Sequence, residues 1–216
     1  MERAAHWNRI FRTRGARERS WTQTRPSRSL AFIATARLPA GSLLLDAGCG
    51  ASTLADCLVR EGRLRLVLAD VSSAALREIK ARLGARAAAV RLLKADLARG
   101  RVTLRVDCWH DRAVFHFLTR APERRRYLAN LRRCLRPGGF VILAAFAPSG
   151  PEQCSGLPVR RYDAAGLMRE LGPTFRLLRR SSERHHTPFG GAQDFTWILA
   201  RRKQRRGRGA AGGSAP

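Results

Sequence analysis

The sequence predicts an α/β fold in which helices cover a parallel sheet. From about Ala40 onward, short apolar runs alternate with segments whose apolar residues recur at helical spacing, a pattern typical of such sheets. The last third departs from this pattern and ends in residues 194–201, where Phe195, Trp197 and Leu199 share one face. A hairpin-like pair of strands is therefore expected at one edge of the sheet. The length of 216 residues fits one domain with extensions.

Five apolar segments predict the parallel strands: residues 43–46, 65–70, 89–94, 106–109 and 140–146. Helices are expected after the first, second and fourth strands and again around Leu167, because apolar residues recur there on one helical face. Ser52 is expected to cap the first helix and Gly62 to end it. A turn at residues 137–139 is expected to end the third helix. Residues 175–181 are expected to form a strand before the final one.

Arginine gives the chain a strong positive charge. The 42 basic residues against 16 acidic ones leave a net charge of +26, which favours a polyanionic partner such as nucleic acid. Only three of the basic residues are lysine, however, and a general bias of the composition toward arginine explains the excess equally well. Residues 201–208 carry basic groups without an acid, so nucleic-acid binding through the basic termini stays open.

Composition divides the chain into three parts. Residues 1–28 are an Arg-rich lead with Trp7 and Trp21, expected to be either a flexible arm or a flap over the site. Residues 29–203 form the α/β domain, and residues 204–216 are expected to be a disordered tail. No apolar run reaches the ~20 residues of a membrane span, and the lead lacks a secretory signal, so no membrane partner and a cytoplasmic location are expected.

The five cysteines form no CxxC pair and are widely spaced. Such spacing fits neither a zinc site nor a disulfide framework. Buried free thiols and no metal site are therefore expected.

Glycines and acids follow the first three strands, at the edge where a parallel sheet binds its ligands. The first strand leads into Asp46, Gly48 and Gly50, and the glycines let the backbone approach a ligand closely. Thr53 stands where a dinucleotide fingerprint needs a third glycine. Because Asp46 would repel a pyrophosphate, the turn favours a positively charged cofactor.

Asp70 and Asp96 complete the expected pocket. Asp70 lies 20 residues after Gly50, the spacing at which an acid binds ribose hydroxyls, although it also suits a cap for the next helix. Asp96 follows the third strand and is placed either to accept a hydrogen bond from an adenine amino group or to form a turn. Together with the glycine turn, the acids predict a pocket for an adenosine without phosphates.

Four segments resemble motifs of the class I S-adenosylmethionine-dependent methyltransferases. They are DAGCGAS, VLAD, KADL and LRPGGFVILAAF, and the similarity covers about residues 20–203. Four blocks further resemble a bacterial subfamily of these enzymes, in the same order: SWTQTRPSRSL, DCWHDRAVFHFLT, GPEQCSGLPVRRY and HHTPFGGAQDF. The resemblance implies a Rossmann-like sheet of seven strands with helices on both faces and the last strand antiparallel. It also implies S-adenosyl-L-methionine as cofactor and methyl transfer as the activity.

Within this resemblance the expected cofactor-binding residues are Asp46, Gly48, Gly50, Asp70, Asp96 and Trp109. Trp109 is placed either to stack on adenine or to fill the core. His116, between two phenylalanines, is expected to be a core residue.

Acceptor chemistry is expected just after the fourth strand, because methyl transfer needs alignment and, for a protonated nucleophile, a base. His110 or Asp111 is expected to deprotonate or orient the acceptor, and Arg112 to hold an anionic one. Asp111 is also well placed to cap a following helix. His185 and His186 are expected in the loop between the last two strands, over the acceptor side.

The acceptor is expected to be a small molecule or a protein side chain. Methyltransferases that act on base amino groups commonly carry Asn or Asp, two prolines and an aromatic residue after the fourth strand, where this chain has residues 110–113 as HDRA. The positive charge keeps RNA or DNA methyl transfer as an alternative. A non-catalytic module that binds the adenosine cofactor is a further alternative.

Overall fold

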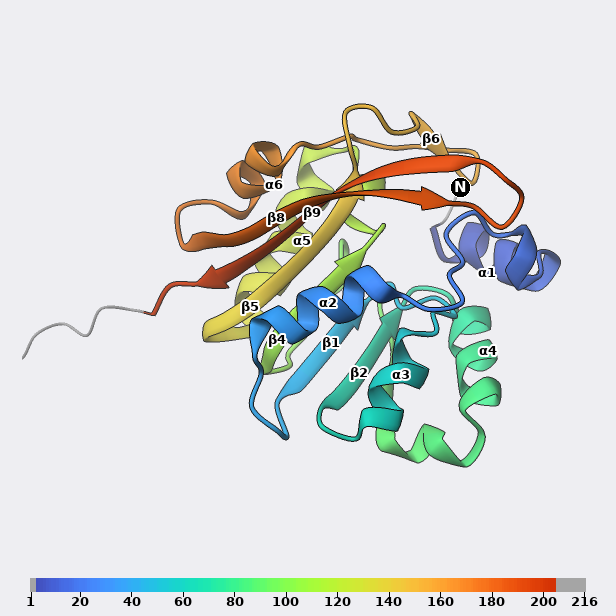
Figure 1. Ribbon diagram of the computed structural model, residues 1–216, viewed down its shortest axis with the longest axis horizontal. Coiled ribbons are helices and arrows are strands. Elements are labelled where there is room, and N and C mark those ends of the chain that lie inside the picture. Colours follow the sequence, from blue (N-terminus) through green and yellow to red (C-terminus); the bar gives the residue numbers. More distant parts are fainter. Residues whose placement is uncertain (1–2, 205–216) are drawn as a thin grey trace, which may run out of the picture.

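The computed structural model describes residues 3–204, which form a seven-stranded sheet with helices on both faces (Figure 1). The strands lie in the order β3-β2-β1-β4-β5-β9-β8, and among the described strands of this sheet β9 alone runs in the opposite direction to the others. The strands are β1 Leu43–Ala47, β2 Arg65–Asp70, β3 Val90–Lys94, β4 Val106–Arg112, β5 Leu135–Phe146, β8 Phe175–His186 and β9 Ala192–Arg202. The α/β class and the antiparallel last strand are confirmed.

Helices flank the sheet, and a short hairpin lies beyond its edge. The α-helices are α1 Arg3–Thr13, α2 Ser27–Ala36, α3 Leu54–Glu61, α4 Ser73–Leu83, α5 Ala121–Cys134 and α6 Ala164–Leu171. Single turns of 3-10 helix occur at η1 Ala16–Glu18 and η3 Phe115–Phe117, with a longer one at η2 Gly84–Ala89. The hairpin pairs β6 Gln153–Cys154 with β7 Leu157–Pro158.

Alternate residues of each strand feed two separate cores, because successive side chains of a strand point to opposite faces. On one face, strand residues such as Leu45 and Val141 pack with α5 and α6. On the other face, strand residues such as Leu44 and Ile142 pack with α2, α3 and α4. The central strands are buried on both faces, which explains why they appear in the sequence as continuous apolar runs.

Two strands are longer than the sequence predicts. β4 was expected to end at residue 109 but continues to Arg112, so the segment expected to follow the strand belongs to it. Its polar side chains alternate between the two faces, and pairing with β1 and β5 holds them in the sheet. β8 likewise continues to His186, so His185 and His186 lie in a strand and not in the loop, because pairing with β9 runs to the hairpin end.

Two helix ends also differ from expectation. Thr53 and not Ser52 is the N-cap residue of α3, although Ser52 Oγ accepts a hydrogen bond from the Leu54 amide at 3.1 Å. Gly62 ends α3 with a positive φ of 65°, as expected. α5 ends at Cys134, and the Pro-Gly-Gly turn expected to end it lies inside β5.

Most of the lead is folded and docked on the domain. α1 packs against α4 (Figure 1), where Asn8 Oδ1 accepts hydrogen bonds from Ser72 Oγ at 2.9 Å and the Ala74 amide at 3.0 Å. Asn8 thereby satisfies a free amide at the start of α4. Buried Arg19 donates through Nη1 and Nη2 to the two carboxylate oxygens of Glu78 in α4, each at 2.8 Å.

The expected tail at residues 204–216 lies almost wholly outside the described residues, which end at 204. Within residues 3–204, none of the helices combines the length and the apolar character that crossing a bilayer requires.

His116 is a core residue, as expected, and its Nδ1 accepts a hydrogen bond from the Phe146 amide at 3.2 Å. Burial, with a smaller contribution from the Arg112 charge, lowers the pKa of His116 from 6.5 to about 3. The unfolded chain therefore binds a proton below about pH 6.5 that the folded protein does not bind until about pH 3, so this residue makes the free energy of unfolding fall as the pH drops through that window.

His116→Gln is expected to remove this dependence. Between about pH 6 and pH 4.5, the free energy of unfolding of the variant should fall less steeply than that of the wild type, by up to about 1.4 kcal/mol per pH unit. Urea unfolding at several pH values measures the slope, with His186→Gln on the surface as the matched control. If the free energy of unfolding depends on pH equally in His116→Gln and in the wild type, His116 is not the source of this pH dependence.

Candidate active site

Two adjoining cavities open at the carboxyl ends of the strands. The first, the aromatic cavity, encloses about 110 Å³ and is walled largely by rings: Trp7, Phe11, Trp21, Phe117, Phe146 and Phe195. The second, the polar cavity, encloses about 250 Å³ and includes Ser29, Asp46, Glu78, Arg82 and His110 in its wall. Trp21, Gly48, Gly50 and Arg112 line both. These shared wall residues make the two cavities neighbours, and we treat them as two parts of one candidate site.

The glycine turn after β1 forms the boundary between the cavities. Gly48 has a φ of 66° and Gly50 a φ of 52°, both in the region that favours glycine. A Cβ on Gly48 would lie 2.0 Å from Val114 Cγ2, so this glycine is required by the packing of the turn against the segment after β4. A Cβ on Gly50 would lie 3.1 Å from Phe11 of α1, where it would narrow the aromatic cavity.

Asp70 ties the glycine turn to the start of α4. Its Oδ2 accepts a hydrogen bond from the Gly50 amide at 2.8 Å and its Oδ1 one from the Ser72 amide at 2.7 Å. Burial raises the pKa of Asp70 to about 6, against the opposing effect of these hydrogen bonds. Each carboxylate oxygen keeps a further acceptor position, so Asp70 serves the start of the helix and also faces the aromatic cavity.

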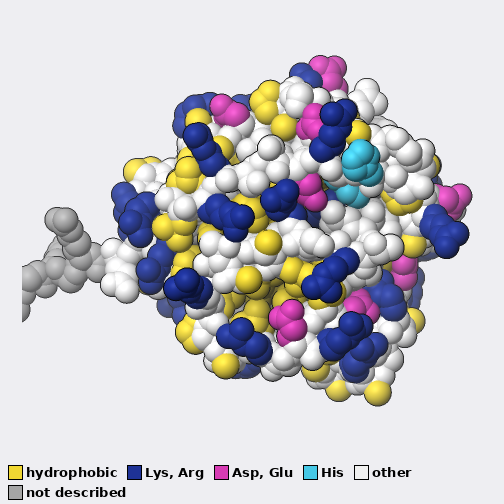
Figure 2. All heavy atoms as spheres, in the orientation of Figure 1, with side chains coloured by type: hydrophobic (Ala, Val, Ile, Leu, Met, Phe, Trp, Pro, Cys, Tyr) yellow, Lys and Arg dark blue, Asp and Glu magenta, His cyan; other side chains and the backbone are white. Residues whose placement is uncertain are grey.

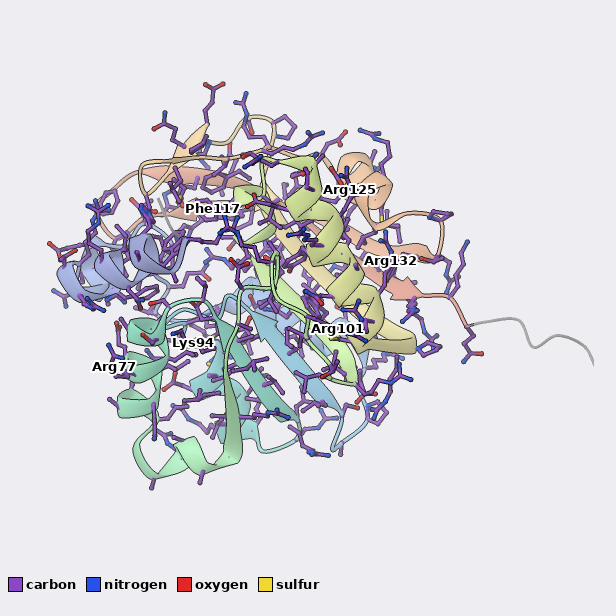
Figure 3. The ribbon with its side chains drawn as sticks, turned by 180° about the vertical axis from the view of Figure 1, so that it is seen from behind. Arg77, Lys94, Arg101, Phe117, Arg125 and Arg132 are labelled. Carbon is purple, nitrogen blue, oxygen red and sulfur yellow. The ribbon has the colours of Figure 1, made fainter. Side chains whose placement is uncertain are left out.

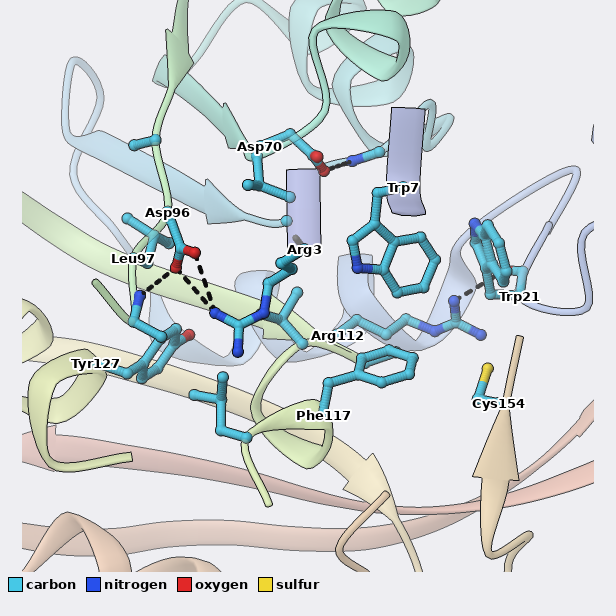
Figure 4. A pocket seen from close by; sticks show the side chains of 18 of the residues that line it. Arg3, Trp7, Trp21, Asp70, Asp96, Leu97, Arg112, Phe117, Tyr127 and Cys154 are labelled. Carbon is cyan, nitrogen blue, oxygen red and sulfur yellow. Dashed lines mark hydrogen bonds and ion pairs between the residues drawn. The ribbon is translucent and has the colours of Figure 1, made fainter. Parts of the chain in front are cut away.

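Asp96 lines the same cavity and is held by the N-terminal helix. Arg3 Nη1 donates to both carboxylate oxygens of Asp96, at 3.0 and 3.1 Å (Figure 4). Arg3 Nη2 donates to Glu123 at 2.8 Å. Asp96 Oδ1 also accepts from the Ala98 amide at 2.9 Å, as a turn-forming residue does. Arg3 thus fastens α1 across the edge of the cavity, and this part of the lead covers the site.

Asp46, His110 and Ser29 form a buried chain along the polar cavity. His110 Nδ1 lies 2.7 Å from Asp46 Oδ1, and His110 Nε2 lies 3.0 Å from Ser29 Oγ. Both ring nitrogens are therefore occupied, and the ring lines the polar and not the aromatic cavity. The arrangement makes His110 a residue that positions Asp46 and Ser29.

Asp111 and Trp109 lie away from both cavities, in the core under α5. Asp111 Oδ1 accepts the Val114 amide at 2.9 Å, its Oδ2 accepts the Tyr127 hydroxyl, and Trp109 Nε1 donates to that hydroxyl at 2.9 Å. Burial raises the pKa of Asp111 to about 6. The two residues thus support the turn after β4. Asp111 accepts backbone amides at the start of a helical turn, as a capping residue does, and Trp109 is a core residue.

Arg112 is the residue of the expected acceptor group that reaches the aromatic cavity. Its side chain extends toward Trp21, whose carbonyl accepts from Nη1 at 2.9 Å (Figure 4). Its guanidinium lies 5.0 Å above the ring centre of Phe195. His185 stays outside the cavity wall, and its Nε2 contacts the Ser20 carbonyl at 2.6 Å.

Several residues of the cavity wall were not predicted from the sequence. Arg3, Phe11 and Gln193 were not expected in the site, and Trp7 and Trp21 were only associated with a flap. The sequence did hold a signal for three of the wall residues. Trp21, Cys154 and Gln193 belong to three of the blocks that resemble the bacterial subfamily, and all three line one cavity.

Comparisons with known proteins agree with the fold. The model of a methyltransferase domain family matches residues 45–141, which run from β1 into β5 and include the glycine turn, Asp70 and Asp96. No curated protein matches the sequence.

Solved structures share the fold. One, described for the conversion of a disulfide bond into a thioacetal group during echinomycin biosynthesis, has a TM-score of 0.73 at 19% identity, over 94% of each chain. The N-methyltransferase NodS from Bradyrhizobium japonicum, with S-adenosyl-L-homocysteine, has a TM-score of 0.71 at 16% identity, over 92% of this chain and 97% of that one.

A third structure is the 1,6-didemethyltoxoflavin-N1-methyltransferase of Burkholderia thailandensis, with 1,6-didemethyltoxoflavin and S-adenosylhomocysteine bound. Its TM-score is 0.63 at 22% identity, over 83% of this chain and 78% of that one. Residues 45–141, with the glycine turn and both acids, thus match a methyltransferase domain, and the chain shares the fold of these methyltransferase structures.

Proposed function

We propose that the enzyme transfers the methyl group of S-adenosylmethionine to a small-molecule acceptor bound in the aromatic cavity. The observation that carries this proposal is the wall of that cavity, in which the adenosine-side residues Asp70 and Asp96 continue into rings from α1, η3 and β9. A narrow space roofed by a helix admits a small flat molecule and excludes a folded polymer. Among the structures that share the fold, one holds 1,6-didemethyltoxoflavin beside S-adenosylhomocysteine.

The residues present fit the cofactor. We propose that Asp70 binds the ribose hydroxyls through the acceptor positions left free by Gly50 and Ser72. Asp96 would accept a hydrogen bond from the adenine amino group and would give up one of its hydrogen bonds from Arg3. Asp46, held by His110, faces the polar cavity and suits the positively charged end of the cofactor.

The protein's part in the reaction is mainly to align and to exclude water. When bound, S-adenosylmethionine supplies an electrophilic methyl group on a positively charged sulfur. Trp21 and Arg112 line both cavities, so they stand where cofactor and acceptor meet. The rings around them hold a flat acceptor in one orientation, and such alignment accounts for a large share of the rate of a displacement.

The acceptor half of the described cavity wall lacks a carboxylate or imidazole base, and burial raises the pKa of Tyr127 and Cys154, which line it. Apart from Asp70 and Asp96 on the adenosine side, the described wall of the aromatic cavity holds no Asp, Glu or His. The expected roles of His110 and Asp111 as bases therefore give way to positioning in this proposal. The acceptor attacks with a lone pair that is already free, and the nearby Arg112 charge favours an acidic acceptor in its ionised form.

We also propose membership of the bacterial subfamily with the WHDRAVFHFL and CSGLPV blocks. In support, one cavity gathers Trp21, Phe117, Cys154 and Gln193, one from each of the four blocks. Because the four blocks line one cavity, we expect enzymes that share all four blocks to methylate similar acceptors.

The alternatives are less well supported. Lys and Arg side chains are spread over the face shown in Figure 2 among acidic and apolar ones. From behind, Arg77, Arg101 and Arg125 come from α4, the segment before β4 and α5, and lie apart (Figure 3). A nucleic-acid or protein acceptor would need a continuous surface leading into the site. A non-catalytic module would have no use for an aromatic cavity beside the adenosine residues.

We further propose a cytoplasmic location for the enzyme. All five cysteines are free thiols. Free thiols are typical of a reducing compartment.

Cofactor binding is the first test. Calorimetric titration with S-adenosylhomocysteine should give a clear 1:1 binding curve, and Asp70→Asn should weaken the affinity about 5- to 150-fold, because a buried ribose hydroxyl then loses a charged acceptor worth ~1–3 kcal/mol. Asp107→Asn, at the opposite end of the sheet, is the matched control and should bind as the wild type does. Wild-type protein that releases no heat and shows no thermal shift would refute the proposed cofactor.

The acceptor class is the second test. An extract incubated with the enzyme and cofactor carrying a radiolabelled methyl group should accumulate label in the small-molecule fraction, and Asp70→Asn should reduce it at least tenfold. Label confined to the protein or nucleic-acid fraction would contradict a small acceptor and select one of the alternatives.

Arg3 provides the third test, because its ion pair fastens α1 over the site. Arg3→Met should raise both the association and the dissociation rate constants of S-adenosylhomocysteine severalfold, since a loosened cover opens more often. Stopped-flow tryptophan fluorescence, sensitive to Trp7 and Trp21, measures both rates. Arg136→Met removes an ion pair to Asp107 at the far end of the sheet and should change neither. Unchanged rates in Arg3→Met would show that α1 does not limit access.

A further inference from the structure

Arg112 carries a buried guanidinium edge without a partner. Nη1 donates to the Trp21 carbonyl, but Nε and Nη2 are buried and have no hydrogen-bond partner. Arg112 also forms no ion pair within 4.0 Å of any described carboxylate, and burial lowers its pKa against a smaller opposing effect of the Glu183 charge. A buried charge with unsatisfied donors is unfavourable unless an anion supplies the acceptors.

Two arginines of the described chain that are buried as whole residues show what is missing. Arg19 faces the Glu78 carboxylate at 2.8 Å and Arg124 faces the Glu170 carboxylate at 3.0 Å. Arg112 alone among these three lines the aromatic cavity. Its missing carboxylate is therefore expected to come from a ligand in that cavity.

The surroundings define the rest of the ligand. The Arg112 guanidinium lies over Phe195, and Phe117, Trp7 and Trp21 continue the aromatic wall, with 5.0 Å between the ring centres of Trp7 and Phe117. Rings of this kind select a flat, apolar body by stacking and edge contacts.

Gln193 adds a second polar requirement. Its side chain is 8% exposed, it lines the same cavity, and its Oε1 is buried without a hydrogen-bond partner. A free carbonyl oxygen accepts a hydrogen bond, so the matching ligand group is an N–H or O–H donor.

We propose that the acceptor is a planar aromatic carboxylate that pairs its carboxylate with Nε and Nη2 of Arg112 and donates a ring amino or hydroxyl group to Gln193. This inference rests on the proposed function and names its substrate class. Two parallel donors on one edge of a guanidinium match the two oxygens of a carboxylate. The other source of a carboxylate is the methionine part of the cofactor, and the experiment separates the two.

The experiment uses the full chain and pairs of probes. With S-adenosylhomocysteine at saturation, calorimetry compares aminobenzoates, hydroxybenzoates and indole carboxylates with their matched carboxamides. At least one acid should bind ten times more tightly than its amide, and Arg112→Met should reduce that preference to less than twofold. Gln193→Leu should weaken the acid severalfold and keep the preference.

Controls separate this inference from the cofactor. Arg179→Met is matched, because Arg179 also lies 5.0 Å from a ring centre, that of Phe32, but lines neither cavity, and it should keep the preference. S-adenosylhomocysteine and 5′-methylthioadenosine, which lacks the amino-acid part, are titrated into Arg112→Met. Both should bind within twofold of wild type.

Two results would overturn the proposal. If no acid is preferred over its amide in the wild-type protein, the acceptor is not an aromatic carboxylate. If Arg112→Met loses affinity for S-adenosylhomocysteine tenfold and keeps it for 5′-methylthioadenosine, the carboxylate belongs to the cofactor. Failure of the proposed function itself looks different, because the wild-type protein would then bind neither adenosine compound.

Discussion

The absence of a side chain at Gly48 is the constraint on which the site depends. The carbon that any other residue would add there lies within the space of Val114. The turn after β1 is therefore pressed against the segment after β4, at the point where the order of strands across the sheet reverses. This close contact forms the common floor of the two cavities and brings Arg112 beside the glycine turn.

The glycine turn after β1 and its contact with the acid at the end of β2 were predictable because they depend on local sequence. Gly50 and Asp70 sit at the ends of neighbouring parallel strands, and a buried apolar run fixes where each strand ends. The fold class followed from the same runs and from the alternation around Trp197. These features need no knowledge of distant contacts.

The surroundings of the polar residues at the end of β4 were not predictable in the same way. The polar residues His110 and Asp111 resemble a loop in the sequence, but pairing with β1 and β5 keeps them in a strand and directs them to opposite faces. Their partners Ser29 and Tyr127 come from separate helices. Arg3 meets Asp96 across 93 positions of the chain. Only the complete fold brings such pairs together.

Several arginines within the described residues form hydrogen bonds to backbone carbonyls of the chain. Arg82 donates to the carbonyls of Ala51 and Ser52 in the glycine turn, and Arg124 to those of Leu118 and Thr119. Carbonyls at turns and helix ends lack partners of their own, and a guanidinium supplies several donors at once. A high positive charge can therefore arise from the bracing of loops, without a polyanionic partner.

Asn8 gives α4 a cap that comes from another part of the chain. The Ala74 amide and the hydroxyl of Ser72 both donate to its side chain, 64 to 66 positions away. Any displacement of α1 consequently leaves the first turn of α4 incomplete, directly after Asp70. Hydrogen bonds thus link α1 to the start of the helix that follows Asp70, so an opening of α1 also removes part of the cap of α4.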